Sequence, residues 1–124
     1  MNDLILLDTN ILIYLLKGDE KIISILEERV PVISVITEIE LLSFPNTKPS
    51  ELSSIKKLIA DCQVVSLNKS VKKEAIELRK QFKLKTVDSI VAATAKFLNL
   101  PLITADKSFA KLDKALSQIL IYKP

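Results

Sequence analysis

Four acidic side chains in this chain stand where they could act together on a ligand. Asp8 follows the apolar run Leu4–Leu7, which has the length and character of a buried parallel strand. Asp106 ends the segment ITAD, at the carboxyl end of another expected strand. Glu40 lies about one turn into an expected helix, and Asp88 lies in the first turn of another. Because parallel strands point their carboxyl ends the same way, we expect these carboxylates to converge on one edge of a sheet.

Carboxylates that lie close together repel one another unless a cation neutralises them. The chain has no histidine and one cysteine, Cys62, which excludes Ser-His-Asp triads and zinc sites built from histidine or several cysteines. Oxygen ligands alone suit a hard cation, Mg²⁺ or Mn²⁺. Such an ion lowers the pKa of a bound water and stabilises charge on a phosphate under attack. The four acids therefore predict a metal site that activates water against a phosphate ester.

Each acid also has a purely structural interpretation. Asp8 can cap the following helix, and Asp88 can complement the dipole of its own helix. Asp106 can be a turn residue. Taken singly, each acid leaves both interpretations open. Four acids at one sheet edge together favour a shared ligand.

Helical periodicity does not decide which of two glutamates after the second strand, Glu38 or Glu40, faces the other acids. Glu38 and Glu40 are two residues apart, so on a helix their side chains point about 200° apart. Glu40 shares its face with Ile36 and Phe44, whereas Glu38 sits nearer Leu42. This spacing favours Glu40 only modestly and leaves Glu38 as the alternative.

Composition indicates one soluble domain spanning residues 1–124. Hydrophobic residues make up 48% of the 124 positions, enough for a sizeable core. The single glycine, Gly18, excludes a P-loop and a dinucleotide-binding fingerprint. No apolar run reaches the roughly 18 residues that cross a bilayer, and no signal-peptide pattern is present. We therefore expect a cytoplasmic protein.

Basic residues are unevenly distributed. The net charge is +3, and seven lysines and arginines crowd positions 69–85 against only Glu74 and Glu77. This excess favours a polyanionic partner, held through phosphate attraction that does not depend on sequence. A solvated helix face is the plainer interpretation. As a hypothesis, the face guides RNA toward the acids.

Alternating apolar patterns predict an α/β fold. The expected strands are Leu4–Leu7, Val32–Val35, Val64–Leu67, Pro101–Thr104 and Ile119–Tyr122. The expected helices are Ile11–Leu16, Lys21–Val30, Ile36–Ser43, Glu51–Asp61 after a Ser50 cap, Ser70–Lys83, Val87–Leu98 after a Thr86 cap, and Ser108–Leu116. Strands that alternate with helices predict a central, mostly parallel five-stranded sheet covered on both faces, a three-layer α/β/α sandwich.

Several segments carry a family resemblance that extends over essentially the whole chain. They are LLDTNILIYLL, SVITEIELL and TVDSIVAATAKFLNLPLITAD, followed by Phe109. The chain resembles the PIN-domain nucleases, in particular the small VapC-type toxins of prokaryotic toxin–antitoxin systems. It departs from that pattern in lacking the usual glycines where Ser43-Phe44 and Asn99-Leu100 stand, which bears on loop shape.

The resemblance implies a Mg²⁺- or Mn²⁺-dependent endoribonuclease on five parallel strands. It implies RNA as substrate and a homodimer held by an antitoxin whose tail blocks the site. It favours Glu40 over Glu38. The metal-site and catalytic acids that it implies are Asp8, Glu40, Asp88 and Asp106, and the residues that support them by hydrogen bonding are Thr9, Asn10 and Thr104.

Other α/β proteins offer alternatives. A phosphorelay receiver also has five strands, and Thr104 and Lys123-Pro124 fit its pattern, but the third strand ends in Ser66-Leu67-Asn68 without a phosphoacceptor aspartate. A phosphatase of the two-aspartate type needs an acid where Asn10 stands. A catalytically silent interaction module with the same fold is the remaining alternative.

Overall fold

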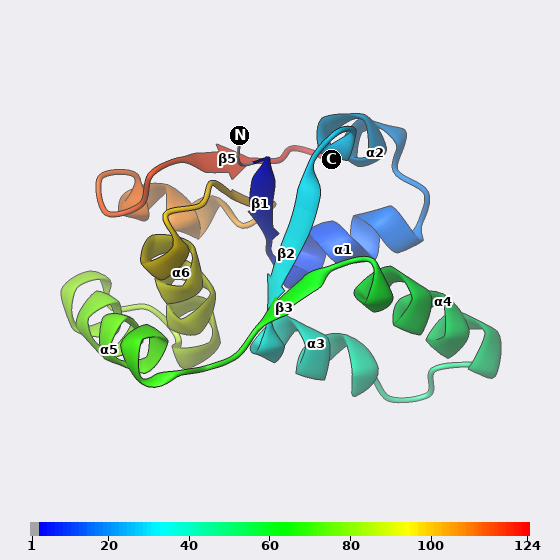
Figure 1. Cartoon of the computed structure of the whole chain (residues 1–124), viewed down its shortest axis with the longest axis horizontal. Helices are drawn as coiled ribbons and strands as arrows, with labels where there is room; N and C mark the ends of the chain where they lie inside the picture. The colour runs from blue at the N-terminus through cyan, green and yellow to red at the C-terminus, as the bar shows by residue number, and fades with distance from the viewer. Residues whose placement is uncertain (1–2) are drawn as a thin grey trace.

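A sheet of five parallel strands, in the order β3-β2-β1-β4-β5, forms the centre of the molecule (Figure 1). The computed structural model describes residues 3–124. The domain predicted over 1–124 also includes Met1 and Asn2, which lie outside the described residues. The strands are β1 Leu4–Leu7, β2 Val30–Ser34, β3 Gln63–Val65, β4 Leu102–Thr104 and β5 Ile119–Ile121.

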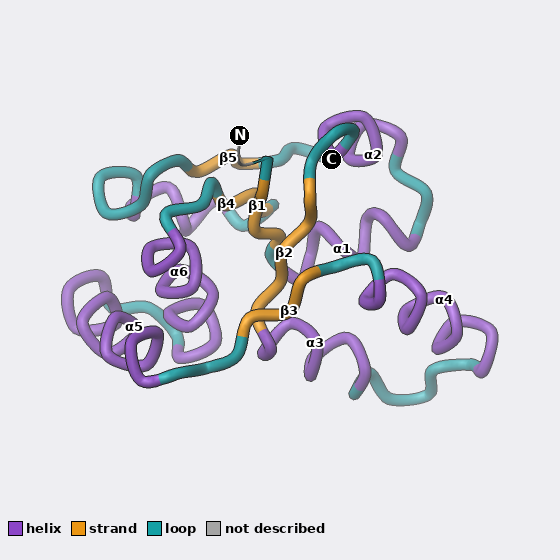
Figure 2. The backbone as a smooth tube through the Cα atoms, viewed as in Figure 1, coloured by secondary structure: helices purple, strands orange, loops and turns teal. Residues whose placement is uncertain are grey.

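Helices cover both faces of this sheet. On one side lie α1, α2 and α4, and on the other lie α5 and α6, as the tube in Figure 2 shows most clearly. The helices are α1 Thr9–Leu16, α2 Glu20–Leu26, α3 Val35–Leu42, α4 Pro49–Ala60, α5 Lys69–Phe82 and α6 Thr86–Leu98, with the 3₁₀ helix η1 at Lys107–Leu112. The predicted three-layer α/β/α sandwich is confirmed, and every strand pair is parallel.

Alternate residues of β1 pack into two separate hydrophobic clusters, one on each face of the sheet. Leu6 packs into a cluster with residues of α5, α6 and η1. Ile5 and Leu7 pack into a second cluster with residues of α1, α2, α3 and α4. All three side chains are fully buried, and burying one large apolar side chain stabilises a fold by about 1.5–3 kcal/mol. The apolar packing therefore fixes the strand whose end carries Asp8.

The second strand begins and ends earlier than the apolar pattern predicts. β2 starts at Val30, whose N–H donates to the carbonyl of Asp3, so that pairing with the chain before β1 extends it beyond Pro31. Val35 is the first residue of α3 and not the end of the strand. The Ser34 hydroxyl caps α3 by accepting from the N–H of Ile36, which starts the helix directly at the sheet edge.

Two predicted helix caps are wrong. α4 begins at Pro49, a favoured first helical residue, and the N–H of Lys48 donates to the Glu51 carboxylate, so Ser50 lies inside the helix. α6 begins at Thr86 itself, because the N–H of Ser89 already donates to the carbonyl of Lys85. The predicted helix Ser108–Leu116 is the shorter 3₁₀ turn η1.

Asn99, which stands at one of the positions where the sequence lacks an expected glycine, adopts a left-handed backbone conformation. Asn99 ends α6 with φ 54°, in the left-handed region that asparagine tolerates better than most residues. The chain therefore turns from α6 toward β4 without a glycine. Among the helices of residues 3–124, none is both long and apolar enough to span a bilayer.

Candidate metal and nuclease site

The predicted acids lie at the carboxyl edge of the sheet, where α1 and α3 leave the ends of β1 and β2 (Figure 1). Asp8 follows β1 directly, and Asp106 follows β4 after one intervening residue. Glu40 is in α3, and Asp88 is in the first turn of α6. Segments far apart in the sequence thus bring their acids to one edge, as expected for parallel strands.

Asp8 is the most enclosed of the four carboxylates, with 8% of its surface exposed. Its Oδ1 accepts from the N–H of Thr9 at 2.8 Å, so Asp8 does cap α1. Its Oδ2 accepts from the hydroxyl of Thr104 at 2.7 Å and from the amide of Asn10 at 3.3 Å. The capping role and a fixed orientation at the sheet edge therefore coexist.

Asn10 and Thr104, which bond to Asp8 Oδ2, also form hydrogen bonds to the backbone at Ala105 and Asp106. The carbonyl oxygen of the Asn10 side chain accepts from the N–H of Ala105 at 3.0 Å. The Thr104 hydroxyl accepts from the N–H of Asp106, also at 3.0 Å. Asp106 in turn caps η1, because its Oδ1 accepts from the N–H of Ser108 at 2.9 Å. The ends of β1 and β4 are thus held in one hydrogen-bonded network.

Glu40, and not Glu38, is brought to the other acids. The Thr9 hydroxyl donates to Glu40 Oε1 at 2.6 Å and lies 3.0 Å from the hydroxyl of Thr37. Thr37 is fully buried and was missed from the sequence. It precedes Glu40 by three residues, so the i, i+3 spacing on a helix face could have found it.

Burial raises the pKa of the Asp8 carboxyl above its ordinary value. The hydrogen bonds from Thr104 and from the Thr9 N–H oppose this rise, and the charges of Asp88 and Glu40 add to it. An ionised Asp8 is therefore held in a place where water is scarce and other negative charges are near. A cation at this position would relieve both costs.

Burial likewise raises the pKa of Asp88, and the charges of Asp106 and Glu40 raise it further. Lys85 and Lys111 oppose that rise. Asp88 is half-buried, and within residues 3–124 its carboxylate accepts no hydrogen bond. Lys111 was missed from the sequence, although it stands close to Asp106, whereas Lys85 belongs to the basic stretch at positions 69–85 that the sequence had singled out.

The donor set suits a hydrated hard cation better than a fully protein-bound one. In the described part of the chain, no three acidic side chains are gathered closely enough to hold one ion together. Neighbouring acids nevertheless help to raise the pKa of two of them: Asp88 and Glu40 act on Asp8, and Asp106 and Glu40 act on Asp88. Mg²⁺ keeps several waters and needs only one or two carboxylates in direct contact. The oxygen donors are therefore of the kind that Mg²⁺ or Mn²⁺ takes, with one or two carboxylates in direct contact and water at the remaining positions.

A separate apolar pocket of about 390 Å³ lies between α1, α4 and the loop that follows α3. Ile13, Phe44 and Ile55 are among the residues that line it, and none of the four acids does. The charged edge of the sheet, and not this pocket, therefore carries the groups that could do chemistry.

Comparison with known proteins agrees with this geometry. The model of the PIN domain family matches residues 5–115. A chain of a toxin–antitoxin complex from Klebsiella pneumoniae is 28% identical with a TM-score of 0.82, covering 96% of this chain and 98% of that one. A chain of VapBC-1 from nontypeable Haemophilus influenzae is 26% identical with a TM-score of 0.80, covering 95% and 97%.

A third solved structure is VapBC-5 from Mycobacterium tuberculosis, one chain of which is 25% identical with a TM-score of 0.72 over 97% of this chain and 99% of that one. No curated protein sequence matched. Since the family's pattern spans residues 5–115 of the 124, the chain belongs to the PIN domain family.

Proposed function

We propose that this protein is a Mg²⁺- or Mn²⁺-dependent endoribonuclease that hydrolyses phosphodiester bonds of RNA. One observation carries the proposal. Carboxylates from four separate segments lie at one sheet edge, and burial and mutual repulsion disfavour the charges of two of them, Asp8 and Asp88. A cation resolves that conflict, and a chain without histidine has few other ways to activate water.

In this proposal the metal ligands, direct or through water, are Asp8, Glu40, Asp88 and Asp106. The hydroxyls and amide of Thr9, Asn10 and Thr104 hold two of these carboxylates in place through the hydrogen bonds described above. A divalent ion bound there would lower the pKa of a water and stabilise negative charge on the phosphate.

The reaction adds the oxygen of water to phosphorus and breaks one P–O ester bond. The proton of the attacking water passes to a base, and the leaving ribose oxygen takes up a proton to become a hydroxyl. The oxygens of Asp88 are suited to orient the water or to accept its proton, because no group in residues 3–124 donates a hydrogen bond to them. The neighbouring carboxylates repel RNA until the cation is present. Binding of the metal ion should therefore strengthen binding of RNA at the site, and RNA should in turn strengthen binding of the metal ion.

A toxin role in a toxin–antitoxin pair is part of the same proposal. The solved structures that this chain matches at 25–28% identity are named as a toxin–antitoxin complex and as VapBC assemblies. We infer that this chain acts in the cytoplasm as a homodimer and is restrained by an antitoxin. A receiver function is not proposed, because no acid follows β3, where Ser66, Leu67 and Asn68 stand.

The proposal is tested by cleavage of labelled single-stranded RNA with Mg²⁺ or Mn²⁺ and with a chelator. Wild type should cut only with the metal. Asp8→Asn should lose activity by on the order of 100-fold or more, because loss of even an outer contact to a metal costs about 10–100-fold. The exposed Asp113, at the end of η1, provides a matched control as Asp113→Asn. Cleavage that persists in chelator, or in Asp8→Asn at the wild-type rate, would overturn the assignment.

A further inference from the structure

Two lysines, Lys85 and Lys111, stand on either side of the Asp88 and Asp106 pair along the chain. Lys85 is the residue that precedes α6, three positions before Asp88. Lys111 lies in η1, the 3₁₀ helix that Asp106 caps. Both lysines therefore belong to the elements that carry Asp88 and Asp106, and in keeping with that placement their charges favour the ionised form of Asp88. They are called the flanking lysines below.

The side chains of the two flanking lysines make no ion pair or helix cap that would stabilise the fold, within the described residues. Both side chains are exposed. Within residues 3–124 neither lysine forms an ion pair, since the salt bridge found there joins Lys96 to Glu74. Lys85 makes no side-chain capping bond at the start of α6. Exposed charges of this kind contribute little to stability, typically about 0–1 kcal/mol. Their ammonium groups therefore remain free to bind an anion.

The charge balance changes once the acids have a cation. A divalent ion neutralises two of the four negative charges of the cluster, and the two ammonium groups of the flanking lysines balance the other two, so the metal-bound site no longer repels a phosphate. RNA brings one negative phosphate for each nucleotide. An RNA strand that places one phosphate at the acids must place its neighbouring phosphates close by. The start of α6 and η1, which carry the flanking lysines, adjoin the acids on either side along the chain.

We propose that Lys85 and Lys111 bind the RNA backbone phosphates next to the one that is cut. This inference rests on the proposed function and adds to it the residues that hold the substrate in register. Side chains of this kind recognise phosphate without reading the base, so they position the strand and do not select its sequence.

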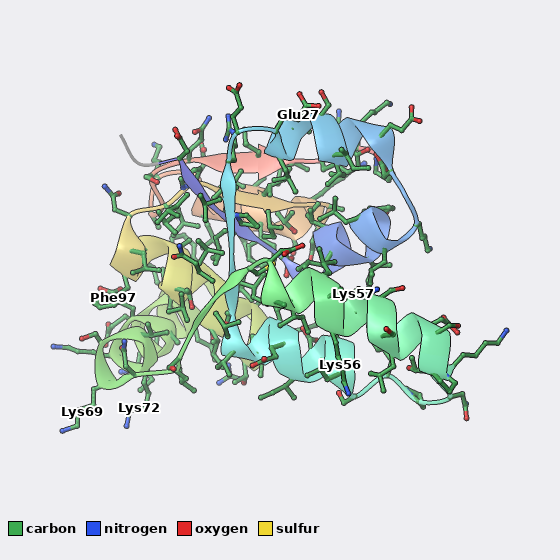
Figure 3. All side chains as sticks on the ribbon, turned by 45° about the vertical axis from the view of Figure 1, so that its right-hand side comes forward. Glu27, Lys56, Lys57, Lys69, Lys72 and Phe97 are labelled. Carbon is green, nitrogen blue, oxygen red and sulfur yellow. The ribbon has the colours of Figure 1, made fainter. Side chains whose placement is uncertain are left out.

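Other lysines provide matched controls. Figure 3 shows Lys69 and Lys72 reaching outward from α5, and Lys56 and Lys57 on α4. α4 lies on the opposite side of the sheet from α5 and α6 (Figure 1). Lys57 is exposed like the flanking lysines, so Lys57→Gln removes one charge from the same protein at a place remote from α6.

The test compares Lys85→Gln, Lys111→Gln, their double variant and Lys57→Gln in RNA cleavage with Mn²⁺. For single-stranded nucleic acid, binding weakens by roughly threefold for each phosphate contact between about 50 and about 200 mM salt. We expect each flanking substitution to raise KM by at least that factor at low salt, with kcat retained. Lys85→Arg, which keeps the charge, should restore KM.

A second measurement separates this inference from the proposed function. Anisotropy of labelled single-stranded RNA reports binding in the Asp8→Asn background, and the slope of log Kd against log salt should fall by about 0.7 for each lysine removed. Unchanged KM and slope in the double variant, or an equal change in Lys57→Gln, overturns the role of the flanking lysines. Failure of wild type to cut RNA overturns the nuclease instead, and the binding slopes then still decide whether the lysines hold phosphate.

A structural role for the flanking lysines predicts a different pattern. Removing a charge that only eases repulsion among the acids would lower the melting temperature of the metal-free protein and leave RNA binding unchanged. Thermal melts of the same variants in chelator measure this directly. Loss of stability without loss of RNA affinity would therefore also overturn the proposal.

Discussion

The hydroxyl of Thr9 donates a hydrogen bond of 2.6 Å to the carboxylate of Glu40, 31 positions further along the chain. This contact joins the first turn of α1 to α3 at the edge of the sheet. Thr9 also donates its N–H to Asp8, so one residue orients two acids at once. The relative placement of Asp8 and Glu40 is therefore built into the fold before any ligand binds.

Glu40→Gln is expected to reduce metal-dependent RNA cleavage by on the order of 100-fold or more, because the amide cannot supply the negative charge that a cation needs. Glu38→Gln provides a control on the same helix, since Glu38 makes no contact with the other acids among residues 3–124. Cleavage rates and calorimetric titration with Mn²⁺ measure both variants. Equal losses in the two variants would show that the charge of α3, and not the position of Glu40, is what matters.

Thr104→Val is expected to weaken both the site and the fold. The substitution removes the donor to Asp8 Oδ2 and leaves the N–H of Asp106 without its acceptor, at a cost of about 1–3 kcal/mol in the free energy of unfolding. Mn²⁺ affinity should fall by about 10–100-fold, as for other losses of a group that orients a ligand. Denaturant unfolding and Mn²⁺ titration provide the two measurements.

Thr94→Val is the matched control for that substitution. Thr94 is also buried, but its hydroxyl donates to the carbonyl of Ile90 within α6 and not to an acid. Its loss should change stability without changing Mn²⁺ affinity. A Thr104→Val protein that binds Mn²⁺ as tightly as Thr94→Val would contradict an orienting role for Thr104.

Asp88→Asn is expected to stabilise the protein in chelator near neutral pH. Burial and the charge of Asp106 raise the pKa of Asp88 in the folded state, so the ionised group destabilises the fold above that raised pKa. The destabilisation is relieved as pH falls from the raised pKa toward the ordinary value of 3.8. The gain in melting temperature for Asp88→Asn should therefore shrink over the same window.

Asp19→Asn should lower the melting temperature in chelator near neutral pH, the opposite of the change expected for Asp88→Asn. The hydrogen bond from Tyr122, followed by that from the N–H of Ile22, lowers the pKa of Asp19. Its contribution to stability is present above 3.8 and is lost as pH falls through the lowered pKa. Thermal melts across pH in chelator compare the two variants. A lower melting temperature for Asp88→Asn at neutral pH would contradict the repulsion that the metal site requires.

Charge reversal on α5 tests whether the basic helix attracts RNA from a distance. Lys72 and Arg79 lie seven residues apart on one face and are exposed, while Val71 and Leu78 are buried on the inner face. Lys72→Glu with Arg79→Glu should raise KM and flatten its salt dependence, because long-range attraction to phosphate is screened by salt. Lys56→Glu with Lys57→Glu on α4 is the control, and an equal effect there would reject a guiding role for α5.

Much of the fold could be predicted because its signals are local. The apolar runs at β1 and β4 are buried on both faces, and such strands read as continuous hydrophobic segments. The acids at the ends of these strands, Asp8 directly after β1 and Asp106 one residue beyond β4, therefore had fixed positions relative to the sheet edge. Their convergence followed from the parallel topology alone.

The remaining details depend on contacts that periodicity does not encode. Glu40 and not Glu38 accepts from the hydroxyl of Thr9, and this contact comes from another helix that the periodicity of α3 does not describe. Lys48 and not Ser50 precedes α4, because Pro49 is accommodated in the first turn. The burial that raises the pKa of Asp8 is likewise a property of the assembled layers, so no window of sequence contains it.

A crystal soaked with Mn²⁺ tests the central claim most directly, through the anomalous difference density that the ion produces. The account predicts a peak at the carboxyl edge of the sheet, in contact with one or two of the carboxylates of Asp8, Glu40, Asp88 and Asp106 and linked to the others through water. Density confined to acids on outer helical faces, with none at this edge, would contradict it.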